Sequence, residues 1–198
     1  MNDRDFVADY IDHMRSVMNI PGLDETLIEA KGILAGVREG GRKLLLAGNG
    51  ASATMASHFA VDFTKQAGTR AIAFNDPALI TAYGNDFGYE EWVANAIRHH
   101  ADPGDAMILI SSSGRSPNIV RAADVCVELG LPVLAFTGFD RDNSLSEKGT
   151  LNFWADSRAY NVIESVHAFW LGILCDLVVG RREYPVSLQG SILTQGNP

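Results

Sequence analysis

The chain contains little cysteine and no excess of basic residues, and both shortages restrict its function. Its 198 residues include two cysteines, Cys126 and Cys175, and neither belongs to a CxxC motif. Isolated cysteines in apolar stretches are typical of buried free thiols, so we expect no disulfide framework and a cytoplasmic location. The net charge of −8 does not supply the positive surface that nucleic acid or an anionic membrane requires. We therefore expect no direct nucleic-acid or membrane partner.

Long apolar runs and nucleotide-binding motifs are also missing. Residues 1–14 are charged and contain no apolar run of signal-peptide length. The longest apolar run, near residues 168–179, is interrupted by Asp176 and is too short to span a bilayer. The segment Gly48-Asn49-Gly50 does not continue to GxGxxG, and no Walker A lysine follows it, so we expect no nucleotide cofactor.

Strand and helix patterns alternate along the chain. Short apolar runs predict strands at 43–47, 70–74, 105–110, 131–136 and 151–154. Helical patterns predict helices at 3–18, 24–38, 52–66, 77–83, 89–100, 117–129 and 160–179, the second of them with Asp24 as its N-cap. Apolar strands that alternate with helices predict an α/β fold, in which a doubly wound parallel sheet is covered by helices on both faces in three layers.

The same pattern suggests how the chain is divided. Residues 1–40 are expected to form an N-terminal helical arm, and residues 41–184 the α/β domain. The segment 185–198 is polar and carries Gly and Pro, so we expect it to be a tail that is partly disordered or lies on a partner subunit.

Two polar turns follow apolar strands and are the strongest signals for a ligand site. The turn 48–52 (GNGAS) combines glycines, which let the backbone approach a ligand, with Ser52 at the start of a helix. The turn 111–116 (SSSGRS) brings four hydroxyl groups to another helix N-terminus. One serine of each turn could simply cap its helix. Two such turns at the strand ends of a parallel sheet favour phosphate binding, with neutral donors around the anion.

Two pairs of titratable residues have helical spacing. His58 and Asp62 lie four residues apart on one predicted helix, and Glu164 and His167 lie three apart on another. Facing each other, the pairs could form a metal site or an acid–base pair. Alternatively, each pair could be hydrogen-bonded within its own helix. We predict that all four residues converge in one pocket near the serine turns.

The motifs GNGAS at 48–52, HFA at 58–60, GNDFG at 84–88 and SSSGRS at 111–116 occur here in one chain. In this combination the sequence resembles the SIS (sugar isomerase) domain family, and within it is most similar to the phosphoheptose isomerases. The resemblance covers the chain to about residue 179. It implies a flavodoxin-like, five-stranded parallel sheet, a sugar phosphate as ligand, and a homotetramer whose sites are shared between subunits.

The resemblance also implies roles for individual residues. The substrate would be bound by Asn49, Gly50, Ser52, Asp86, Ser111, Ser112, Ser113, Ser116 and Glu164. Asp62 would be the catalytic base, and His167 could act as the acid in place of a missing histidine. A zinc ion, as found in some family members, would be held by His58, Asp62 and Glu164.

Three positions depart from the family pattern. Asp62 stands where the family has a glutamate, Glu164 where it has a glutamine, and Gly172 where it has a second, catalytic histidine. These departures leave two functions open. One is an aldose–ketose isomerase that acts on sedoheptulose 7-phosphate or a related sugar through a cis-enediol. The other is a non-catalytic protein of this fold, which binds a sugar phosphate or associates with the replication initiator DnaA.

Overall fold

Five parallel strands form one sheet in the computed structural model, which describes residues 1–183 of the chain. They are β1 (Leu44–Gly48), β2 (Ala71–Ala73), β3 (Ala106–Ile110), β4 (Val133–Thr137) and β5 (Leu151–Trp154). Their order across the sheet is β2-β1-β3-β4-β5, and each neighbouring pair is parallel. The predicted α/β class and five-stranded parallel sheet are confirmed. The predicted tail, 185–198, lies outside the described residues.

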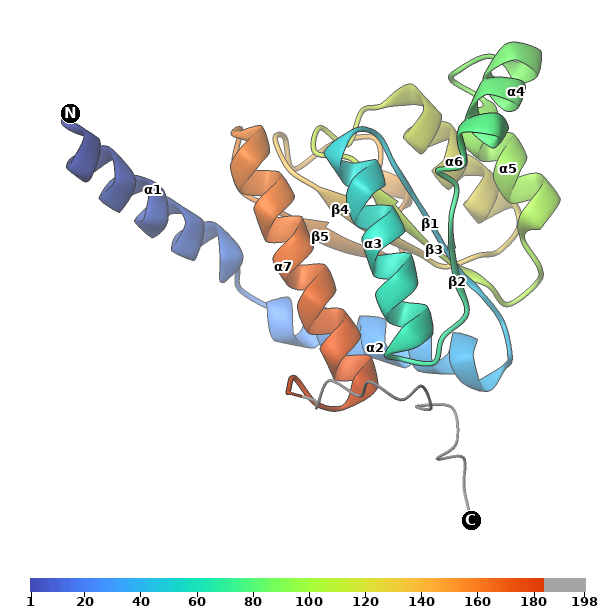
Figure 1. Cartoon of the computed structure of the whole chain (residues 1–198), viewed down its shortest axis with the longest axis horizontal. Coiled ribbons are helices and arrows are strands. Elements are labelled where there is room, and N and C mark those ends of the chain that lie inside the picture. The colour runs from blue at the N-terminus through green and yellow to red at the C-terminus, as the bar shows by residue number, and fades with distance from the viewer. Residues whose placement is uncertain (184–198) are drawn as a thin grey trace.

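Helices cover both faces of the sheet (Figure 1). In chain order they are α1 (Asp3–Met18), α2 (Leu23–Glu39), α3 (Ala51–Lys65), α4 (Pro77–Phe87), α5 (Trp92–His100), α6 (Pro117–Glu128), the 3-10 turn η1 (Ser146–Lys148) and α7 (Tyr160–Val179). Helices α2, α3 and α7 pack on one face, whereas α5 and α6 pack on the other. The predicted three-layer arrangement is therefore confirmed.

The central strands are buried on both faces, which explains their nearly continuous apolar sequences. In β1, Leu44 and Leu46 point toward α2, α3 and α7, whereas Leu45 and Ala47 point toward α5 and α6. On the first face Phe136 and Phe153 stack with their ring centroids 4.4 Å apart. Alternating strand residues thus divide the core into two layers, one on each side of the sheet.

Several predicted boundaries differ from those in the structure. Asp24 is not an N-cap: α2 begins at Leu23 after Gly22, whose left-handed backbone (φ 77°) forms the turn out of α1. Helix α4, capped by Asp76, continues through Gly84 to Phe87 instead of ending at Tyr83, and it stops at Gly88, whose φ is 85°. The predicted helix 89–100 begins only at Trp92, after a turn.

The predicted N-terminal arm, residues 1–40, has two parts with different surroundings. Helix α2 belongs to the core, where Leu27, Ala30 and Leu34 are buried. Helix α1 projects from the body and touches α7 near its C-terminal end (Figure 1). There the Trp170 indole N–H donates to the Met18 carbonyl at 2.9 Å.

Helix α7 is the one helix among residues 1–183 that is long and apolar enough to span a membrane. The apolar run is thus longer than the sequence analysis expected. Half of its apolar window is buried inside the protein, with Trp170, Leu171 and Leu174 in the core. These contacts are those of a core helix that packs on a sheet.

Candidate functional site

The two polar turns predicted from the sequence meet at the carboxyl edge of the sheet. In the β1–β3 ladder Gly48 stands opposite Ile110, so both strands end at the same level. The chain winds outward from β1 to β2 in one direction and from β3 to β4 in the other. Ligands bind at such a reversal in open parallel sheets, because the connections diverge there and leave a crevice.

A cavity of about 140 Å³ lies at this position. It is lined by Asn49, Ser52, Ile110, Ser111, Ser112, Ser113, Ser116, Tyr160 and Glu164. Seven of the nine substrate-binding residues predicted from the sequence are among them. Pockets for drug-sized ligands measure about 300–1,000 Å³, so this cavity suits one small polar group and not a whole sugar phosphate.

Three helices begin at the cavity. Ser52 lies in the first turn of α3, Ser116 is the N-cap of α6, and Tyr160 is the first residue of α7. None of the three N-termini has a side-chain cap. The Ser52 and Ile119 amides donate to the Asn49 and Ser116 carbonyls, and Pro117 has no N–H, so only the other first-turn amides keep their hydrogen-bonding capacity for a ligand. Helix N-termini carry partial positive charge, and three of them favour an anion here. Tyr160 was not among the predicted site residues, although the start of a helix after the last strand could have indicated it.

Glycines allow the close approach of these segments. A Cβ atom on Gly48 would lie 2.7 Å from the backbone and Cβ of Ser52, so only glycine lets α3 begin so close to β1. Gly50 has φ 56° and Gly114 has φ 62°, a region that residues with side chains rarely adopt. A Cβ on Gly114 would also meet the Asn143 side chain, which fixes the serine loop against the β4–β5 connection.

A pair of amide side chains ties the two polar turns together. Asn49 and Asn118 exchange hydrogen bonds of 2.9 Å in both directions, and the Tyr89 hydroxyl donates to Asn49 Oδ1 at 3.1 Å. Asn118 is buried in the first turn of α6. Asn49 therefore has a positioning role in the unliganded chain. Sequence reasoning missed Asn118 and Tyr89, because each is an isolated residue whose partner lies far away in the chain.

Hydroxyl groups supply most of the polar surface of the cavity. Ser111 donates to Ser116 at 3.2 Å, and Ser113 accepts the Arg115 backbone N–H at 3.2 Å. Among the described residues that line the cavity, Glu164 is the only carboxylate and none is Lys, Arg or His. The cavity can thus surround an anion with neutral donors, but Glu164 adds one negative charge at its wall.

The structure does not bring the four titratable residues together within one chain. His58 and Asp62 pair along α3, with His58 Nε2 3.3 Å from Asp62 Oδ2, and His58 is largely exposed. Asp62 also accepts from Gln66 at 3.0 Å and lies near Asp176, whose pKa is raised by burial and by the charge of Asp62. Asp62 is about 15 Å farther along the helix axis than Ser52. The predicted convergence with Glu164 is therefore not found in the described chain.

His167 lies away from the cavity, beneath α7. Its side chain is fully buried, its ring stands edge-on to Phe136, and its Nε2 bonds the Thr137 carbonyl at 2.9 Å. Burial lowers the pKa of His167 to about 4, and the bond to the Thr137 carbonyl opposes this shift only partly. A fully buried ring that bonds a backbone carbonyl and does not line the cavity gives no support to a role for His167 as the catalytic acid.

Two further predictions concerned the sugar and a metal ion. Asp86 lies in the last turn of α4, exposed, and accepts from the Asn85 amide at 2.9 Å; it does not line the cavity. Within residues 1–183, no group of three or more His, Cys, Asp or Glu side chains is placed to hold a metal ion. At Gly172 an added Cβ would meet no described atom within 4 Å, so a larger side chain would fit there.

The sequence is similar to those of several phosphoheptose isomerases. The phosphoheptose isomerase of Aliarcobacter butzleri is 30% identical over 179 residues, which is 87% of this chain and 94% of that protein. The phosphoheptose isomerase of Thermodesulfovibrio yellowstonii is 38% identical over 152 residues, 74% of this chain and 75% of that protein.

Solved structures and a family model extend the comparison. A phosphoheptose isomerase from Francisella tularensis superposes with a TM-score of 0.81 at 25% identity, covering 91% of this chain and all of that one. One from Neisseria gonorrhoeae gives 0.80 at 26% identity, with 88% and 96% covered. The model of the SIS domain matches residues 9–138. The chain belongs to the SIS domain family.

Proposed function

We propose that the protein is a phosphosugar isomerase that interconverts an aldose and a ketose phosphate, with sedoheptulose 7-phosphate or a related sugar as substrate. The observation that carries this proposal is the serine-lined cavity at the start of three helices. Its relatives are named phosphoheptose isomerases, which favours the isomerase over a non-catalytic regulator or a DnaA-associating protein.

The phosphate group of the substrate would occupy the cavity. The hydroxyls of Ser52, Ser111, Ser113 and Ser116 and the free amides of the helix N-termini supply donors for its oxygens. The cavity is too small for the sugar, which would extend from its mouth. Binding the phosphate in this way helps to position the reacting carbons, because a fixed remote group restricts the rest of the substrate.

The reaction requires one base that takes a proton from the carbon next to the carbonyl and returns it to the former carbonyl carbon. The intermediate is a cis-enediol, in which both carbons carry hydroxyl groups. The carbonyl oxygen gains a proton as the enediol forms, and the neighbouring hydroxyl oxygen releases one as it collapses, so a second proton passes between the two oxygens. Asp62 is the proposed base because it stands where the family has a glutamate. Since it lies about 15 Å along α3 from Ser52, it would serve the site of a neighbouring subunit in the proposed tetramer. Glu164 is the one carboxylate among the described lining residues, and it would contact the sugar at the cavity mouth. His167 takes no part.

Three finer statements belong to the same proposal. Zinc at His58, Asp62 and Glu164 stays a prediction; the described residues of one chain do not group around an ion, so no step is assigned to it. The homotetramer with shared sites is supported by the exposed apolar face of α1. The cytoplasmic location is supported by two buried, free cysteines.

Turnover of sedoheptulose 7-phosphate by the purified chain, with and without added zinc, tests the proposal. Ser113→Ala with Ser116→Ala should weaken binding of the sugar phosphate about tenfold or more, since each charge-assisted hydrogen bond contributes roughly 1.5–3 kcal/mol. Asp62→Asn should abolish turnover and leave binding nearly intact, because it removes the base and spares the phosphate site. Absence of turnover together with tight binding would instead establish a sugar-phosphate sensor.

A further inference from the structure

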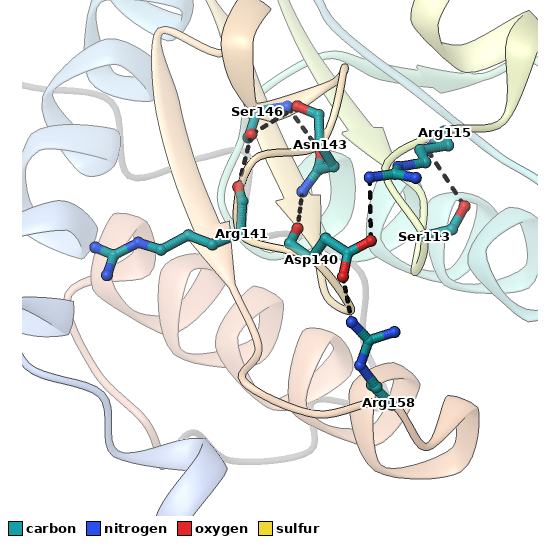
Figure 2. A network of polar contacts seen from close by, with 7 residues as sticks. All are labelled: Ser113, Arg115, Asp140, Arg141, Asn143, Ser146 and Arg158. Atoms are coloured by element: carbon teal, nitrogen blue, oxygen red, sulfur yellow. Dashed lines mark hydrogen bonds and ion pairs between the residues drawn. The ribbon is translucent and has the colours of Figure 1, made fainter.

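Two arginines and one aspartate form an ion-pair cluster near Ser113, one of the serines that line the cavity (Figure 2). Asp140 Oδ2 lies 3.0 Å from Arg115 Nη2, and Asp140 Oδ1 pairs with the guanidinium of Arg158. One carboxylate thus holds two guanidinium groups, which leaves the cluster with a net charge of one positive unit. We call these three residues the arginine clamp.

The three residues come from three connections that surround the cavity. Arg115 is part of the serine loop, between the lining residues Ser113 and Ser116. Arg158 precedes α7 and lies two residues before the lining residue Tyr160. Asp140 follows β4 and bridges the other two connections (Figure 2). Both arginines are therefore attached to the walls of the cavity, on different segments.

The backbone that carries Asp140 is itself held in an unusual conformation. Phe139 has φ 53°, and it is the only non-glycine residue with positive φ in the described part of the chain. Its N–H donates to the Ser157 carbonyl at 2.9 Å, and its ring lies 5.0 Å from that of Tyr160. The preceding Gly138 N–H donates to the Ser112 carbonyl at 2.8 Å. A strained residue anchored to both neighbouring loops indicates that the position of Asp140 has a function.

A contribution to folding stability does not explain why these three residues form ion pairs. The side chains of Arg115 and Arg158 are 58% and 72% exposed, and ion pairs this exposed contribute little to the free energy of folding. Each guanidinium has five N–H donors and uses only part of them on Asp140. The remaining donors are free to meet a ligand at the cavity.

The charge of the cavity creates a need for such cations. A phosphate monoester is a dianion at neutral pH, and Glu164 places a further negative charge at the cavity wall. No Lys, Arg or His is among the described lining residues, so cations at the rim would add the opposite charge that the neutral donors lack.

We propose that Arg115 and Arg158, held in place by Asp140, are specificity-determining residues that select a dianionic phosphate monoester at the serine cavity. This inference rests on the proposed function and deepens it. The arginines contact the phosphate oxygens from the rim, where they offset Glu164, while the serines and helix amides bind from within. Asp140 is a positioning residue: it keeps two like charges side by side, which would otherwise repel each other.

Calorimetric titration with inorganic phosphate at low salt tests the clamp directly. Arg115→Gln and Arg158→Gln should each raise the Kd of phosphate about three- to tenfold. This is less than the loss of a buried charge-assisted hydrogen bond would cause, because both side chains are exposed to solvent. With sedoheptulose 7-phosphate the KM should rise while kcat stays nearly constant, because the lost contact binds substrate and transition state alike. Arg98→Gln is the matched control, since Arg98 forms an exposed ion pair with Glu128 at 3.0 Å, outside the cavity lining.

The Asp140→Asn variant tests whether Asp140 acts by positioning the two arginines or only by its charge. It adds a positive unit near the cavity, so an effect of charge alone predicts tighter phosphate binding. The clamp predicts weaker binding, because the guanidinium groups lose their common anchor. Thermal unfolding of each variant should match the unsubstituted protein, which shows that folding is intact.

The possible results test the arginine clamp and the proposed isomerase function separately. Unchanged phosphate affinity in both arginine variants, or tighter binding in Asp140→Asn, would overturn the clamp and leave the isomerase proposal standing. A protein that binds neither inorganic phosphate nor the sugar phosphate, in its unsubstituted form, would overturn the proposed function itself.

Discussion

His167 is buried as a neutral imidazole, and its protonation is coupled to folding. Nε2–H donates to the Thr137 carbonyl, while Nδ1 is buried without a partner among the described residues. The folded pKa of about 4 lies below the usual 6.5, so the unfolded chain binds the proton more readily. The free energy of unfolding therefore carries its full contribution from neutral His167 above about pH 6.5, and this contribution is lost as the pH falls toward 4. Urea unfolding should show a loss of about 1.5–2 kcal/mol between pH 6.5 and pH 5 from this group.

His167→Gln serves as the control, since its side-chain amide can still donate to the carbonyl but does not titrate. The variant should lose stability at pH 7 through imperfect packing, yet lose less on acidification than the unsubstituted protein. Equal losses in the two proteins over this pH range would show that His167 is not the titrating group.

At the residue scale, the sequence identified the serine turns because their neighbours in the chain are also their neighbours in the site. It could not identify the clamp, whose members Arg115, Asp140 and Arg158 lie on three separate connections. The burial of His167 could not be predicted for another reason. Its spacing from Glu164 is compatible with a shared face, but α7 is apolar around most of its circumference, so spacing did not reveal that the imidazole faces the sheet.

The approach of α3 to β1 depends on Gly48, and a paired substitution tests this at the level of elements. Gly48→Ala should destabilise the protein by about 1–3 kcal/mol, because the new methyl group collides with the backbone of Ser52. The same shift of α3 should weaken phosphate binding. Gly36→Ala is the counterpart: Gly36 lies inside α2 with open space around it, so alanine should stabilise the helix by about 0.5–1 kcal/mol.

Urea unfolding and phosphate titration of both variants provide the measurement. A Gly48→Ala protein as stable as the unsubstituted chain would mean that β1 and α3 can separate without cost, against the close contact described above.

Element types were predicted well because apolar strands and helical periodicity are local properties. Leu151–Trp154 and Tyr160–Val179 have the bounds expected from the sequence. The boundaries of other elements differ from the predicted ones because they depend on contacts outside the element. Asp24 had the chemistry of an N-cap, but the turn at Gly22 starts α2 one residue before it.

At the scale of the whole molecule, α1 presents an apolar face without a described partner. Phe6 and Val7 are 58% and 55% exposed, and Tyr10 and Ile11 are also exposed. We expect a homotetramer at micromolar concentration, with α1 packed on neighbouring subunits. Phe6→Glu combined with Tyr10→Glu should lower the mass measured by light scattering, because burial of a carboxylate in an apolar interface is costly. Asp9→Ala, on the same helix, should leave the mass unchanged, and a monomeric unsubstituted protein would contradict the prediction.

The cavity of about 140 Å³ also bears on how such a protein can change over time. With the proposed phosphate inside it, the cavity would enclose the part of a ligand that all sugar phosphates share and leave the distinguishing carbons at the rim and beyond. Substitutions there alter which sugar is accepted, while the anchoring anion remains bound. A lineage can therefore exchange one substrate for another, or give up turnover altogether, without having to rebuild the site from which it began.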